Sequence, residues 1–235
     1  MGEILIGTSG YYYDDWKGVF YPEHLPKGEY LSYYSARFKT LELNYSYYRI
    51  PDTRQSRQMV EKAGSRLEFT IKAFRGLTHE IGEKSMDRVL PLFIKGISPF
   101  IEGKQLGALL IQFPQSFHYT VENRYYVKTI LEALADLPVA VEFRQKEWLR
   151  DSVFRALEGM HAAFVCVDEP SLPSLIPPIA IATSDIGYIR FHGRNKNDWY
   201  GTDSKTRYDY LYSEDELSEW TTRIHNLASK TKKLF

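Results

Sequence analysis

Several apolar segments of this sequence end in polar residues that lie two positions apart. Three such pairs follow segments that resemble buried strands: Glu42 with Asn44, Glu142 with Arg144, and Arg190 with His192. Because residues two positions apart share a face of a strand, both members of each pair would point the same way. A buried charge is costly unless it is paired or used, so these positions are candidates for a binding or catalytic site.

Lys72 and Gln112 lie late in two further segments, and Asp168 follows another. These residue types suit acid–base chemistry on a ligand that carries a phosphate or a carboxylate, as in hydrolysis or lyase-type proton transfer. The candidates for proton transfer are Glu142, Asp168, His192 and Glu42. The candidates for ligand binding are Asn44, Lys72, Gln112, Arg144, Arg190, Trp16, Tyr48, Trp148 and His79.

The same residues allow two other interpretations. A Glu–Arg pair at a strand end can be purely structural, and His192 alone is more often a hydrogen-bonded core residue than a catalyst. Glu142, Asp168 and His192 could instead bind a divalent cation in a metal-dependent sugar or nucleic-acid enzyme. Arg144 and Arg190 would compete with a cation for those carboxylates and suit an anionic ligand better. The sequence also lacks H-E-x-x-H or a comparable ligand spacing, so we expect no metal, and it lacks a nucleotide-cofactor fingerprint, so we expect no cofactor.

The segment HGRNKNDWYGTDSKTRYDY, residues 192–210, mixes basic and aromatic residues. Such a mixture is typical of surfaces that bind single-stranded nucleic acid, so a non-catalytic nucleic-acid or nucleotide binding module is the alternative function. Asp198, Asp203 and Asp209 reduce the positive charge around Lys205, and the whole chain has 30 basic and 30 acidic residues. We prefer the interpretation of the segment as a mobile loop or lid over the site.

The elements that must position these residues alternate along the chain. Amphipathic helical segments separate the apolar ones; Asp52 is a predicted helix cap, and Ser213 with Glu216 forms a predicted capping box. The predicted strands are residues 3–8, 40–44, 67–73, 106–112, 139–143, 162–167 and 187–192, and KKLF opens an eighth. We therefore predict an α/β fold of the TIM-type (β/α)8 barrel class as a single domain, residues 1–235, with an open doubly wound sheet as the alternative.

Bulk properties limit the remaining possibilities. The length of 235 residues suits one α/β barrel, and the single cysteine, Cys166, excludes an intramolecular disulfide and is a predicted core thiol. No apolar run approaches the roughly 20 residues that span a membrane, and the start lacks a signal-peptide pattern. We expect a cytoplasmic protein with a small anionic or nucleotide-like ligand and no membrane partner.

Six motifs resemble the YecE-like family, also known as domain of unknown function 72. In chain order they are IGTSGYYYDDWKGVFYP, YYSARFKTLELNYSYYRIP, FTIKAFRGLTHE, LGALLIQFPQSF, VAVEFRQKEWL and GYIRFHGRN. The resemblance covers nearly the whole chain and implies a TIM-type barrel. It implies no established activity, and a distant likeness to barrels that act on sugars or on abasic nucleic acid is fold-level analogy.

The sequence departs from that family pattern at two places. Tyr11, Tyr12 and Tyr13 occupy a region where family members usually have tryptophan, although Trp16 is retained. Family members also continue past the last strand with an asparagine-containing segment and a closing helix, whereas this sequence stops at Phe235. We therefore expect an incomplete eighth β/α unit, with two unpaired strand edges unless a missing segment or a partner fills the gap.

Overall fold

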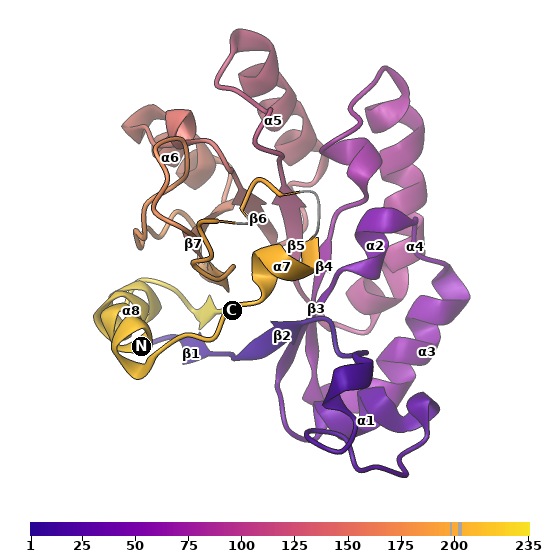
Figure 1. Cartoon of the computed structure of the whole chain (residues 1–235). Coiled ribbons are helices and arrows are strands. Elements are labelled where there is room, and N and C mark those ends of the chain that lie inside the picture. The colour runs from indigo at the N-terminus through magenta and orange to yellow at the C-terminus, as the bar shows by residue number, and fades with distance from the viewer. Residues whose placement is uncertain (198, 202–203) are drawn as a thin grey trace. The chain divides into compact units, whose positions relative to one another are not determined.

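The computed structural model describes residues 1–197, 199–201 and 204–235 (Figure 1). The chain forms two compact units, each of which is treated by itself: an N-terminal unit, Leu5–Ile111, and a C-terminal unit made of Met1–Ile4 and Gln112–Phe235. Helices alternate with strands in both units, and every paired strand in each unit runs parallel to its neighbour. The predicted α/β fold is therefore confirmed, while the predicted single domain stays a prediction.

The N-terminal unit contains a parallel sheet with the strand order β2-β3-β4-β5. Its strands are β2 (Gly7–Ser9), β3 (Thr40–Leu43), β4 (Glu68–Lys72) and β5 (Leu106–Gln112), the last residue of which belongs to the other unit. Its helices are α1 (Tyr30–Ser35), α2 (Tyr45–Tyr48), α3 (Thr53–Ala63) and α4 (Leu90–Glu102). Apolar side chains bury β3, β4 and β5 almost completely, which is typical of parallel strands covered on both faces.

The C-terminal unit contains a second parallel series with the order β6-β7-β8-β9-β1. Its strands are β6 (Val139–Glu142), β7 (Ala163–Asp168), β8 (Ile186–Phe191), β9 (Lys233–Leu234) and β1 (Glu3–Ile4). Its helices are α5 (Val121–Ala133), α6 (Asp151–Gly159), α7 (Ser204–Tyr208) and α8 (Glu214–Ala228). Figure 1 shows α8, in yellow, near the marked N-terminus and β1.

Both predicted helix starts are confirmed. The Asp52 carboxylate accepts a hydrogen bond of 3.0 Å from the Gln55 backbone N–H, which fixes the first turn of α3. The Ser213 hydroxyl and the Glu216 carboxylate bond each other's backbone N–H groups at the start of α8. Each bond satisfies a backbone donor that the helix itself leaves without an acceptor.

The two ends of the chain differ from the expectations. The predicted first strand, residues 3–8, is two short strands: β1 pairs with β9, whereas β2 pairs with β3. KKLF forms β9 as predicted, and β9 lies between β8 and β1 with a further backbone bond of 2.8 Å from the Ile189 N–H to the Phe235 carbonyl. The strand of the eighth unit is therefore present, so the expected pair of open strand edges at this position is wrong.

The helices of the chain are short or carry polar faces. Within residues 1–197, 199–201 and 204–235, none combines the length and the apolar character that crossing a bilayer requires.

Candidate functional site

Strand register decides which side chains of the C-terminal unit share a face. Val167 pairs with Arg190, and Asp168 pairs with Phe191. Side chains alternate along a strand and paired residues lie on the same face, so Arg190 and Asp168 point to opposite faces of the sheet. Glu169, one position beyond Asp168, therefore lies on the Arg190 face. The two faces carry two separate polar clusters.

The first is the Glu142 cluster, made of Gln112, Glu142, Arg144, Arg190 and His192. The Glu142 side chain has no exposed surface, and its Oε2 accepts a bond of 2.6 Å from Arg190 Nη1. Its Oε1 accepts bonds of 3.2 Å from Arg144 Nε and 3.1 Å from His192 Nε2. Arg190 Nη1 also donates to Gln112 Oε1 at 3.2 Å. The structure thus brings five of the predicted site residues into one network.

Electrostatics fix the protonation of this network. Burial raises the pKa of Glu142, but the Arg190 and Arg144 guanidiniums and the His192 hydrogen bond outweigh it and hold that pKa well below its usual range. Burial lowers the pKa of His192 to about 4, although Glu142 opposes the change. His192 is therefore neutral near pH 7, and its bond to the Glu142 carboxylate assigns the imidazole proton to Nε2. Nδ1 of His192 is left as a hydrogen-bond acceptor.

Arg144 is the residue of the Glu142 cluster that has donors left over. Two guanidiniums meet one ionised carboxylate, and the Arg144 and Arg190 side chains are only 11% and 10% exposed. Within the described part of the chain, Arg144 uses its Nε for Glu142, and its Nη1 and Nη2 groups have no hydrogen-bond partner. The buried indole of Trp199 lies beside it, with the guanidinium carbon 5.9 Å from the ring centre. A planar fork of N–H donors on a cation suits a carboxylate or phosphate.

Glu169 is a candidate site residue that the sequence interpretation missed. Its side chain is 5% exposed, and Oε1 accepts a bond of 3.0 Å from the Ile176 backbone N–H. Oε2 is buried and has no hydrogen-bond partner among the described residues. Burial raises the pKa of Glu169 to about 7, despite the opposing effects of Arg144 and the Ile176 N–H. The two-residue alternation from Val167 was the available signal, because it excludes Asp168 from this face and selects Glu169.

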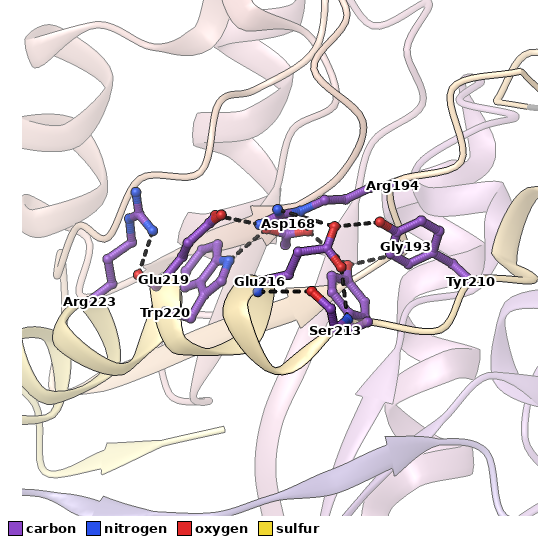
Figure 2. Close-up of polar contacts among 10 residues, drawn as sticks. Asp168, Gly193, Arg194, Tyr210, Ser213, Glu216, Glu219, Trp220 and Arg223 are labelled. Carbon is purple, nitrogen blue, oxygen red and sulfur yellow. Dashed lines mark hydrogen bonds and ion pairs between the residues drawn. The ribbon is translucent and has the colours of Figure 1, made fainter.

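The second group, on the opposite face, is the Asp168 cluster, which Figure 2 draws. It is made of Asp168, Arg194, Tyr212, Glu219 and Trp220. Asp168 accepts four hydrogen bonds: 2.8 and 2.7 Å from Nε and Nη2 of Arg194, 2.8 Å from the Tyr212 hydroxyl, and 2.6 Å from Trp220 Nε1. Arg194 Nη2 also donates to Glu219 at 2.9 Å. Burial raises the pKa of Asp168, but these donors outweigh it and lower the pKa overall.

Asp168 therefore connects β7 to α8 and lies apart from the Glu142 cluster. Its predicted catalytic partnership with Glu142 and His192 is not what the structure shows, because both its oxygens are occupied and its side chain points to the other face. The three candidate metal ligands consequently do not converge. Among the residues that the structure describes, no group of three or more His, Cys, Asp or Glu side chains is placed to hold a metal ion.

Trp148 was expected to line the ligand site, and its position contradicts this. It is a core residue of the C-terminal unit, stacked on Phe143 at 4.1 Å between ring centres and donating from Nε1 to the Phe117 carbonyl at 2.8 Å. Stacking between the aromatic rings and the satisfied indole N–H account for its burial.

Glu42 and Asn44 meet through Ser9 in the N-terminal unit. The Ser9 hydroxyl donates to Glu42 Oε1 at 2.8 Å and accepts from the Asn44 amide. Asn44 Oδ1 is buried without a hydrogen-bond partner in the described ranges. The predicted sharing of one strand face by Glu42 and Asn44 is therefore seen, with Ser9 of β2 as the link.

Lys72 and His79 also lie in the N-terminal unit, and both contact Tyr47. Lys72 Nζ is 4.4 Å from the Tyr47 ring centre, and the His79 ring packs edge-on against Tyr47 at 4.9 Å. Tyr48 is largely exposed, whereas Trp16 packs on its aromatic neighbours near the chain start. The six predicted site residues of this unit are Trp16, Glu42, Asn44, Tyr48, Lys72 and His79. Their convergence with the Glu142 cluster stays a prediction.

The basic and aromatic segment after β8 contacts other loops of its own unit. The Tyr200 hydroxyl is 3.1 Å from the Ser174 hydroxyl and accepts from Gln115 Nε2 at 3.2 Å. Trp199 is buried, so it presents no free ring for base stacking. Asp198, Asp203 and the side chain of Lys205 lie outside the described residues.

Known proteins match this chain over most of its length. A family model described as "Protein of unknown function DUF72" matches residues 5–235. The UPF0759 protein YunF of Bacillus subtilis (strain 168) is 30% identical over 250 residues, covering 99% of this chain and 86% of the relative. The crystal structure of a DUF72 family protein from Thermotoga maritima MSB8 is 38% identical with a TM-score of 0.89, covering 99% and 90% of the two chains. A DUF72 family structure from Enterococcus faecalis V583, 24% identical with a TM-score of 0.87 over 98% and 86%, is similar in fold.

Proposed function

The chain belongs to the DUF72 family, and we propose that it is an enzyme with hydrolase- or lyase-like acid–base chemistry on a ligand that carries a phosphate or a carboxylate. The ligand's anionic group binds at Arg144. The observation that carries the proposal is the end of this guanidinium that has no partner among the described residues, beside a buried carboxylate that holds its Nε. The Arg144 side chain is 11% exposed, so a ligand can reach these donors.

The residues of the cluster take different roles in this proposal. Glu142 stays ionised at neutral pH, so it positions Arg144 and His192 and does not transfer a proton itself. Glu169 has an unoccupied oxygen and a pKa of about 7, which suits a general acid or base near neutral pH. His192 Nδ1 is the second available acceptor. Glu42, Asn44 and Lys72 orient the ligand in this proposal.

The TIM-type barrel is proposed together with this function. Two observations support it: strands run parallel in each unit, and β9 lies between β8 and β1. In such barrels the site lies at the carboxyl ends of the strands. Glu142 is the last residue of β6, and Arg190 is the penultimate residue of β8, as that geometry requires.

The test is a thermal-shift screen of phosphorylated and carboxylated metabolites, followed by titration of the best ligand. Arg144→Gln removes the free fork and should weaken binding at least about 10-fold, since hydrogen bonds to charged groups contribute about 1.5–3 kcal/mol. Arg144→Lys keeps the charge but loses the paired donors, so it should bind with intermediate affinity. The matched control is Arg155→Gln on the exposed surface of α6, which should bind like the wild type.

Two outcomes would replace the proposal. Binding of a random single-stranded oligonucleotide that weakens steeply with salt, together with silence in the metabolite screen, would favour the binding module. Loss of ligand binding after chelation, with recovery on adding a divalent cation, would favour the metal-dependent enzyme. Unchanged affinity in Arg144→Gln would remove Arg144 from the ligand site.

A further inference from the structure

Two opposite charges of the C-terminal unit lie near enough to influence each other, but they do not touch. Arg144 favours the ionised form of Glu169, and Glu169 favours the charged form of Arg144. Within the described part of the chain, however, these two side chains share neither a hydrogen bond nor an ion pair. Each of them therefore keeps a polar end that the other does not use.

The unused atoms of these two residues differ in chemistry. Arg144 spends its Nε on Glu142, and its two terminal amino groups have no hydrogen-bond partner among the described residues. Glu169 accepts from the Ile176 N–H with Oε1 at 3.0 Å, whereas its buried Oε2 has no partner in the same part of the chain. A buried polar atom without a partner costs free energy, so a ligand that bonds Oε2 gains from doing so. Because Glu169 is only 5% exposed, a small polar group suits it best.

The titration of Glu169 indicates which polar group that is. Burial raises the pKa of Glu169 to about 7. Glu142 and Asp168 add to the rise, while Arg144 and the Ile176 N–H oppose it. Both forms of the carboxyl are therefore populated near neutral pH. The ionised form needs a donor at Oε2, and the protonated form needs an acceptor there, because Oε1 is already an acceptor. A hydroxyl both donates and accepts, so it suits either form, whereas a carbonyl or an ammonium suits only one.

Resting on the function proposed above, we infer that the ligand is a hydroxylated anion, in which a hydroxyl lies close to the carboxylate or phosphate. The anionic group binds the terminal amino groups of Arg144, and the hydroxyl bonds Oε2 of Glu169. Both 2-hydroxy acids and sugar phosphates have this chemistry. Glu169 then determines specificity, because an analogue that lacks the hydroxyl leaves Oε2 without a partner.

Matched anions test the hydroxyl without any substitution. Isothermal titration of the full chain at pH 7 compares both enantiomers of lactate with propionate, and 2-hydroxyethyl phosphate with ethyl phosphate. In at least one of these pairs the hydroxylated anion should bind at least about 10-fold more tightly, since it adds a hydrogen bond to a carboxyl that is partly ionised. A preference within the first pair identifies a hydroxy acid, and a preference within the second identifies a sugar phosphate.

Substitutions then assign this preference to Glu169. Glu169→Leu should abolish the preference, whereas Glu169→Gln, whose amide both donates and accepts, should keep much of it. Glu158→Leu, on the exposed surface of α6, is the control and should show the wild-type preference. Structural damage would weaken both anions of a pair alike, so the ratio of their affinities isolates recognition. A preference that survives in Glu169→Leu would remove Glu169 from the ligand site.

Pyruvate tests the two forms of Glu169, because its 2-carbonyl accepts but cannot donate. In the wild type, the affinity for pyruvate relative to propionate should fall as pH rises from 6 to 8, while any preference for lactate persists. In Glu169→Gln the pyruvate ratio should not change with pH. Equal binding of the hydroxylated and plain anions in both pairs would overturn the inference and leave anion binding at Arg144 intact. No binding of any of these anions would overturn the proposed function as well.

Discussion

Asp168 and Glu169 are neighbours in the sequence, but their carboxylates have opposite environments. Asp168 faces α8, receives four hydrogen bonds and has a lowered pKa. Glu169 lies on the face of the Glu142 cluster, receives one bond from a backbone N–H, and has a pKa raised to about 7. Both side chains are buried, so burial alone does not decide the charge. The number of donors decides it, and this separates a fully hydrogen-bonded carboxylate from one that keeps an oxygen without a partner among the described residues.

Removing the Asp168 carboxylate should produce the largest change in the free energy of unfolding. Asp168→Ala leaves Arg194, Tyr212 and Trp220 without their shared acceptor, so the free energy of unfolding should fall by about 3–5 kcal/mol. Urea denaturation followed by tryptophan fluorescence measures the loss. Asp185→Ala, which breaks an exposed pair with Lys232, is the control and should be indistinguishable from the wild type. A loss at Asp168 as small as that at Asp185 would contradict the proposed contrast.

Removing the charge of Glu169 should increase the free energy of unfolding, and the increase should depend on pH. The folded pKa of about 7 lies above the unfolded value, so the wild type loses stability as pH rises from the unfolded pKa to about 7. Below that window the carboxyl is protonated in both states, and nothing is lost. Glu169→Gln should therefore be more stable than the wild type by about 2–3 kcal/mol at pH 8 and equal to it near pH 4.

Denaturation curves of the two proteins at both pH values provide the measurement. Asp168→Asn is the matched comparison, because it should be less stable than the wild type at pH 8 and approach it only as pH falls through the lowered pKa of Asp168. If Glu169→Gln were destabilised at pH 8, Glu169 would be a paired structural carboxylate like its neighbour.

A smaller effect tests a single donor of the Asp168 cluster. Tyr212→Phe removes the hydroxyl that donates to Asp168 at 2.8 Å and accepts from the Gly193 N–H at 2.9 Å, while the ring remains. We expect a loss of about 1–3 kcal/mol in the free energy of unfolding, since the acceptor is charged. Tyr125→Phe, on the exposed face of α5, should change nothing. An equal change in both variants would show that this hydroxyl adds no stability.

The sequence predicted the strands well because parallel strands are continuous apolar runs. The segment 106–112 coincides with β5, and most other predicted boundaries differ from the observed ones by a residue or two. The prediction of one first strand was wrong, because an apolar run does not indicate that its two halves pair with different strands. Periodicity reports burial, and it says nothing about partners.

The site was predicted in part for a related reason. The pairs Glu142–Arg144 and Arg190–His192 followed from two-residue spacing, which is a local property of a strand. Asp168 was assigned to the same cluster from its position alone, although the alternation along β7 points it the other way. Trp148 was assigned by residue type, and its stacking on Phe143 could not be read from the sequence, because packing partners come from tertiary structure.

The pairing of β1 with β9 has a consequence for biosynthesis. The register joins Glu3 to Lys233, and the Gly2 N–H bonds the Ala228 carbonyl at 2.7 Å. A ribosome makes the first of these segments long before the second, so the nascent N-terminus has no strand to pair with while the rest of the chain emerges. Contacts this distant in sequence form slowly, and they leave strand edges exposed meanwhile. The pairing of β1 in the C-terminal unit therefore awaits translation of β9.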